Sequence, residues 1–184
     1  YPIVNGTETT TNFNDASDYI IGDVLPDVYG GFGTSVSWKG FDFSADFTYQ
    51  IGGKVYDGTY AGLMSLDKGY GIHEDMLNAW SPENTGSDIP RMVYNDSYMA
   101  SSSDRFLTDA SYLSLQNVTL GYTLPKSITM KFGVDKLRLY VVGDNLWVWA
   151  KRKGLDPRQS ITGSASSALY SSIRTISGGI SVTF

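Results

Sequence analysis

Cysteine is absent from the 184 residues, and histidine occurs only once. The first absence excludes a disulfide framework and a thiolate metal site. The single histidine, His73, cannot supply a multi-histidine metal site, and we expect it to be an ordinary loop residue. No apolar run approaches the roughly 18 residues that a transmembrane helix requires. Acidic residues outnumber basic ones, 19 to 14, so the charge does not favour a nucleic-acid partner.

Aromatic residues and glycine are plentiful instead, with 13 tyrosines and 20 glycines in the chain. Apolar and polar residues alternate without a break from Phe41 to Ile51, which predicts a β-strand with one apolar face. Residues 32–38 alternate in the same way, and the two residues Lys39-Gly40 between the runs predict a tight hairpin turn. The hairpin register then places apolar residues opposite one another. The predicted pairs are Trp38 with Phe41, Val36 with Phe43, and Phe32 with Phe47.

Three further strands are expected, over residues 117–124, 137–149 and 176–184. Upstream of the first, Leu115 has the opposite parity to Val118, which predicts a β-bulge between them. In the second, the alternation weakens after Gly143. The sequence therefore predicts an all-β fold of antiparallel strands.

The connections between these strands alternate between short and long, with long loops at 52–111 and 150–173. An up-and-down barrel in a membrane typically has tight turns at one end of its strands and long loops at the other end. Alternation alone does not decide whether an apolar face meets lipid or a protein core. A soluble β-sandwich that binds carbohydrate therefore stays open beside the barrel, as does a passive porin. Five strands cannot close a barrel of ~8 or more, so a membrane barrel would need strands from elsewhere.

Three blocks of sequence and the ending carry a family resemblance. They resemble SusC/RagA-type TonB-dependent outer-membrane transporters of the Bacteroidetes. The blocks are residues 23–57, "DVLPDVYGGFGTSVSWKGFDFSADFTYQIGGKVYD", 103–125, "SDRFLTDASYLSLQNVTLGYTLP", and 137–157, "LRLYVVGDNLWVWAKRKGLDP", and the ending is the final Phe184. The first twenty residues and residues 158–172 depart most from that pattern.

The resemblance implies that residues 1–184 form the C-terminal segment of a transmembrane β-barrel, which in this family has 22 strands. The N-terminal plug and remaining barrel strands would be outside this chain, which would then be a piece of a nicked or split transporter. Such transporters import oligosaccharides or peptides across the bacterial outer membrane, energised through TonB. They work with a SusD-like surface lipoprotein, often as dimers of transporter–lipoprotein pairs. The resemblance thus implies a transporter with lipid around its barrel, not an enzyme, and no cofactor.

The candidate functional residues form three groups, none of them a catalytic constellation. Aromatic rings and arginines in the 52–111 loop could bind cargo, or could instead pack the loop on itself or on the lipoprotein; they are Tyr56, Tyr60, Trp80, Arg91, Tyr94, Tyr98 and Arg105. Expected at the membrane interface or facing lipid are Trp38, Phe41, Phe43, Phe47, Tyr49, Trp147 and Trp149. The alternating Ile180, Val182 and Phe184 resemble the signal for barrel assembly. Asp42 and Asp46 would project from the polar face of their strand, as lumen wall and not as an acid/base pair.

Overall fold

The computed structural model describes residues 3–4, 7–10, 12–65, 71–94, 96, 98–99, 101–159, 163–165 and 170–184. The chain divides into two compact units. The first comprises Tyr1–Asp23 and Tyr56–Leu107, and the second comprises Val24–Val55 and Thr108–Phe184.

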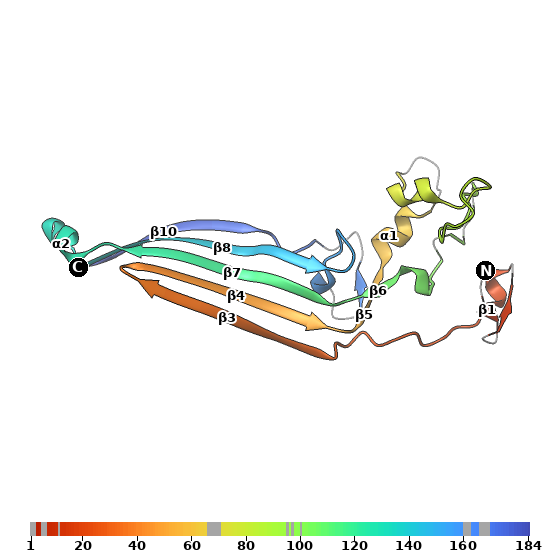
Figure 1. Ribbon diagram of the computed structural model, residues 1–184, viewed down its shortest axis with the longest axis horizontal. Helices are drawn as coiled ribbons and strands as arrows, with labels where there is room; N and C mark the ends of the chain where they lie inside the picture. Colours follow the sequence, from red (N-terminus) through yellow and green to blue (C-terminus); the bar gives the residue numbers. More distant parts are fainter. Residues whose placement is uncertain are drawn as a thin grey trace. The chain divides into compact units, whose positions relative to one another are not determined.

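The second unit contains a five-stranded sheet in the order β10-β8-β7-β4-β3 (Figure 1). Its strands are β3 (Val28–Trp38), β4 (Phe41–Ile51), β7 (Tyr112–Thr123), β8 (Lys136–Ala150) and β10 (Thr175–Thr183). Every neighbouring pair is antiparallel, and the spatial order follows the order of these strands along the chain. The predicted all-β fold and its up-and-down order are confirmed.

The hairpin of β3 and β4 has the predicted register, with Trp38 opposite Phe41 and Phe32 opposite Phe47. Both turn residues have positive φ, 48° for Lys39 and 89° for Gly40, as a type I′ turn requires. The strand starts earlier than predicted, at Val28.

The predicted bulge is also confirmed, because the register shifts between Leu115 and Asn117 of β7. On β8 the same shift skips Asn145 and Leu146, and Asn145 has a φ of 51°. Two residues of β8 thus lie opposite the single Gln116 of β7, and this one extra residue changes the parity, which explains why the alternation along β8 weakens after Gly143.

The connections differ at the two ends of the five-stranded sheet. At one end lie the β3–β4 turn and a segment with α2 (Lys126–Thr129) and η4 (Met130–Phe132). The chain end lies beside them, where the Asp135 N–H donates to the Thr183 carbonyl at 2.9 Å (Figure 1). The long connections start and finish at the other end, after β4 and after β8.

The long connections carry short elements. Between β4 and β7 lie β5 (Lys54–Asp57), α1 (Gly58–Leu63), η2 (Glu74–Asn78), η3 (Asp104–Phe106) and β6 (Leu107–Asp109). Between β8 and β10 lie η5 (Pro157–Gln159) and β9 (Ser164–Ala165), and β6-β5-β9 form a small sheet. Near the start of the chain, β1 (Ile3–Val4) pairs with β2 (Glu8–Thr9) ahead of η1 (Phe13–Asp15). Among the described residues, no helix has the length and apolar character to cross a membrane.

Candidate functional site

The five-stranded sheet has one apolar face that continues across all five strands. Residues directly opposite each other share a face, so the register places Val36, Phe43, Leu120, Val141 and Gly178 in one row. The same face carries all seven residues predicted to meet lipid or its interface, namely Trp38, Phe41, Phe43, Phe47, Tyr49, Trp147 and Trp149, together with Ile180 and Val182. Phe43 remains 40% exposed and Trp149 56% exposed. The fold thus gathers the predicted set on one surface, and its contact with lipid stays a prediction.

The opposite face is polar and carries an ion pair that bridges two strands which are not neighbours. Arg138 of β8 donates through Nε to Asp42 Oδ1 of β4 at 3.0 Å and through Nη2 to Oδ2. The pair crosses β7 at Gly121, where an added Cβ would lie only 2.5 Å from the Asp42 carboxylate and 2.6 Å from the guanidinium. The Arg138 guanidinium also lies 5.0 Å from the centre of the Tyr140 ring. Asp42 projects from the polar face as expected, and its partner Arg138 was not among the candidate residues.

A second polar group occupies the same face at the bulge. Asn117 donates to the Asp144 carboxylate at 2.7 Å, and Gln116 donates to Thr48 at 3.1 Å and to Ser114 at 3.3 Å. Ser114 is fully buried and donates to the Trp147 carbonyl at 3.3 Å. The Ser114 hydroxyl thus satisfies a backbone carbonyl at the bulge, and the other bonds join polar side chains on the same face.

The connection after β8 reaches this group through Arg158, which donates from Nη1 to Ser114 Oγ at 2.7 Å. Two further donors of Arg158, Nε and Nη2, each lie 2.8 Å from an oxygen of the Asp156 carboxylate. Asp156 is only 3% exposed. Burial opposes its ionisation, but the hydrogen bonds and charge of Arg158 outweigh burial and hold the pKa of Asp156 below its usual value. The same hydrogen bonds raise the pKa of Arg158.

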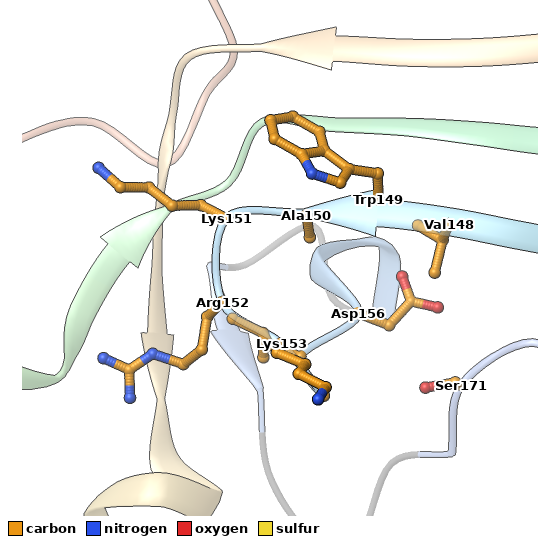
Figure 2. Close-up of a pocket in the computed structure, with 10 residues that line it drawn as sticks. Val148, Trp149, Ala150, Lys151, Arg152, Lys153, Asp156 and Ser171 are labelled. Carbon is orange, nitrogen blue, oxygen red and sulfur yellow. The ribbon is translucent and has the colours of Figure 1, made fainter.

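A pocket of about 500 Å³ lies at this end of β8. Its lining runs from Val148 to Asp156 and includes Ser171 (Figure 2). Figure 2 shows Val148 and Trp149 on opposite sides of the strand, as the alternation requires, with Lys153 and Asp156 on the side away from Trp149. The pocket lining thus includes side chains from both sides of β8, and it includes Asp156 of the Asp156–Arg158 pair.

In the first unit, three of the predicted cargo-binding residues surround Phe106, which is fully buried. The rings of Tyr56 and Tyr60 meet the Phe106 ring edge-on at 6.1 and 6.0 Å, and the Arg105 guanidinium lies 5.5 Å from its centre. Burial lowers the pKa of Arg105, and its Nη2 is buried without a hydrogen-bond partner. Tyr60 also donates to Asp75 at 2.8 Å. Tyr56 and Tyr60 thus pack the core of their own segment, one of the two roles considered from the sequence.

The other predicted cargo-binding residues lie on the surface of the same unit. Trp80 and Arg91 are exposed, Tyr94 is 64% exposed, and Tyr98 stacks on Phe13 with ring centres 5.6 Å apart. In the described part of this unit, no hydrogen bond or ring contact joins Trp80, Arg91 and Tyr94 to one another. Their role in binding cargo stays a prediction.

His73 has a structural role. Its Nδ1 accepts the Asp75 N–H at 3.1 Å at the start of η2, and its ring meets Tyr60 edge-on at 4.7 Å. Within the described ranges, no cluster of three histidine, aspartate or glutamate side chains could hold a metal ion.

Comparisons with known proteins identify similar receptors. The chain is 34% identical over 176 residues to TonB-dependent receptor P3 of Formosa agariphila, covering 90% of this chain and 17% of that receptor. It is 31% identical over 147 residues to TonB-dependent receptor SusC of Bacteroides thetaiotaomicron, covering 78% of this chain and 14% of SusC. The chain therefore spans about a sixth of the length of these relatives. No protein-family model matches it.

The fold is similar to part of a solved transporter. The structure of the RagAB peptide importer in its open-open state matches 96% of this chain and 19% of its own chain, with a TM-score of 0.76 and 28% identity. The RagAB peptide transporter structure matches 90% of this chain with a TM-score of 0.75. The antiparallel strands of this chain thus have the arrangement found in that transporter.

Proposed function

Because this chain belongs to the SusC/RagA-type TonB-dependent receptors, we propose that its sheet is the C-terminal part of the barrel wall of an active outer-membrane importer. The observation that carries the proposal is the division of the sheet into two faces. One face is apolar across all five strands, and the other holds the Asp42–Arg138 pair and the hydrogen bonds around the bulge. An outward apolar face and a polar interior are what a transmembrane barrel requires.

In this arrangement the exposed apolar face contacts lipid. Trp38 lies next to the β3–β4 turn, and Trp147 and Trp149 lie near the opposite end of β8, which places tryptophan near both ends of the strands. Tryptophan side chains favour both membrane interfaces because their rings are amphipathic. The 52–111 and 150–173 connections would then share one side of the membrane, and we propose the outer side, as the family resemblance implies.

The whole receptor would move oligosaccharides or peptides inward with energy delivered by TonB. A SusD-like lipoprotein would cover its outer mouth, and such pairs would assemble as dimers. Support for a peptide cargo comes from the solved relative RagAB, which is a peptide importer. Within this chain, the exposed Trp80, Arg91 and Tyr94 are the side chains that we propose to contact cargo or the lipoprotein.

The experiment that tests the function measures uptake by cells that carry the full-length receptor. Cells would receive isotope-labelled malto-oligosaccharides or a labelled casein digest, with and without a protonophore. An active importer would accumulate at least one probe, and the protonophore or loss of TonB would abolish the accumulation. Deletion of the receptor gene supplies the baseline.

Uptake that persists after de-energising the cells would indicate a passive porin and would contradict the proposal. A full-length receptor that remains in aqueous buffer, without detergent or membrane, would contradict the barrel itself.

A further inference from the structure

The connection that follows β8 contacts the polar face of the sheet through an arginine, Arg158. Arg158 lies in η5, and its Nη1 donates to Ser114 of β7 at 2.7 Å. The connection leaves β8, whereas Ser114 belongs to β7, so this bond joins the connection to a different strand from the one it follows. The two residues are 44 positions apart in the sequence. The bond is therefore a tertiary attachment and not a local turn.

Asp156 fixes the direction in which Arg158 points. Its carboxylate accepts Nε and Nη2 of Arg158 at 2.8 Å each, and it also accepts the Arg158 backbone N–H at 3.1 Å. Both side chains are largely buried, 13% exposed for Arg158 and 4% for Asp156. Paired hydrogen bonds between a guanidinium and a carboxylate restrict geometry strongly. Removing one partner of a buried pair leaves an uncompensated charge, which is strongly unfavourable.

Ser114 has no hydrogen-bonding capacity left for another group. A hydroxyl has one donor and two acceptor positions. The Ser114 hydroxyl donates to the Trp147 carbonyl and accepts from Gln116 and Arg158. Ser114 is also completely buried. The Arg158–Ser114 contact is thus part of the hydrogen-bonded structure at the bulge, and it forms without a ligand.

We propose that Asp156 and Arg158 are positioning residues that hold residues 151–159 as a fixed wall against the polar face during import. This inference rests on the proposed function, because the polar face lines a cargo passage only in an importer. Asp156 itself lines the 500 Å³ pocket together with residues 148–155. A connection tied at Asp156 and Arg158 keeps that pocket in one shape, so cargo meets a preformed surface.

The test uses the full-length receptor with Arg158→Gln, which keeps hydrogen-bonding groups but removes the charge and the guanidinium fork. Hydrogen–deuterium exchange in detergent would follow the amides of residues 151–159. We expect exchange there to accelerate at least tenfold, with little change in β7 and β8. Uptake should show a several-fold higher KM at a similar maximal rate, since cargo would meet a disordered surface.

Two further variants separate positioning from charge alone. Arg158→Lys keeps the charge but cannot form the fork, so it should fall between Arg158→Gln and the native receptor. Lys131→Gln, an exposed cation in η4 at the other end of the sheet, removes the same charge and should change neither exchange nor KM. If Arg158→Gln fails to reach the outer membrane, Ser114→Ala replaces it, because that change removes the attachment point and leaves the ion pair.

The outcomes are distinct. Unchanged exchange at residues 151–159 in Arg158→Gln, or in Ser114→Ala when that variant replaces it, would overturn the attachment. Faster exchange with an unchanged KM would overturn the role in import. If the native receptor took up neither probe, the proposed function would fail, and the exchange result alone would still decide whether the connection is tied.

Discussion

The assignment of the apolar face to lipid predicts opposite results for two adjacent residues of β4. Phe43 lies on the apolar face in the row with Val36 and Leu120, and Ser44 lies on the polar face opposite Ser35 and Thr119. Substituting lysine at each position in the full-length receptor places the same charge on either side of one strand. Phe43→Lys should destabilise the barrel, and Ser44→Lys should be tolerated.

The magnitude follows from the position of Phe43 in the strand. It lies three residues before Asp46, the central residue of β4. At ~3.4 Å per residue and a tilt of about 45°, this is roughly 7 Å from the middle of the membrane. A lysine there costs about 1–3 kcal/mol, between the values of the midplane and the interface. Phe43 is 40% exposed, and losing that apolar contact adds about 0.6–1.2 kcal/mol. The expected total is about 2–4 kcal/mol.

Ser44→Lys introduces a cation on the face that carries Asp42 and Asp46, so we expect a change below about 0.5–1 kcal/mol. Urea unfolding of both receptors in lipid vesicles would give the two free energies, with outer-membrane levels as a check in cells. Equal effects, or a larger effect of Ser44→Lys, would refute the face assignment.

Four other changes test separate features. Deleting Phe184 should lower the outer-membrane level of the full-length receptor several-fold, and a normal level in fractionated membranes would contradict an assembly role. Gly40→Ala should destabilise by about 1–3 kcal/mol in urea unfolding, because φ is 89° and the new Cβ would lie 2.6 Å from a carbonyl oxygen. Gly121→Ala should displace the ion pair above it and cost about 1–3 kcal/mol, whereas Gly178→Ala, whose Cβ has ordinary contacts at 3.8 Å, should cost less. The pKa of Asp156 lies below its usual 3.8. Its pairing with Arg158 should therefore stabilise residues 151–159 at pH values above 3.8, and this stabilisation should be lost only as the pH falls through the lower pKa of the folded state. Loss of hydrogen-exchange protection near neutral pH would refute this.

Much of the sheet could be predicted because its determinants are local. Alternation and a two-residue turn were enough for the register of Trp38 with Phe41, and a change of parity located the bulge near Gln116. Each of these signals depends on neighbours within a few residues. The two faces of the sheet also follow directly, because the parity of a residue along its strand determines the face on which its side chain lies.

The polar contacts could not be predicted in the same way. Asp42 and Arg138 are 96 residues apart and meet only because β7, with Gly121, lies between their strands. Parity places Arg138 on the polar face, but strand order and offset decide its partner. Asp156 and Arg158 lie in a connection without periodicity, where a charged pair two residues apart gives little indication of burial.

The cargo-binding candidates show a different limit. Aromatic residues in a long connection suit both a binding surface and a small core, and composition does not distinguish the two. The structure uses Tyr56 and Tyr60 to enclose Phe106 and leaves Tyr94 exposed. The buried partner that decides this, Phe106, was not among the candidates.

The two outer strands of the sheet, β3 and β10, have a consequence for how the barrel must assemble. Each presents a row of backbone N–H and C=O groups along 11 and 9 residues respectively. In hydrocarbon each such group without a partner costs several kcal/mol. In the membrane proposed for it, this sheet cannot enter lipid stepwise while the backbone groups along either outer strand lack hydrogen-bond partners. Both sides must acquire partners or protection before insertion, so these five strands and their neighbours would insert as one cooperative event.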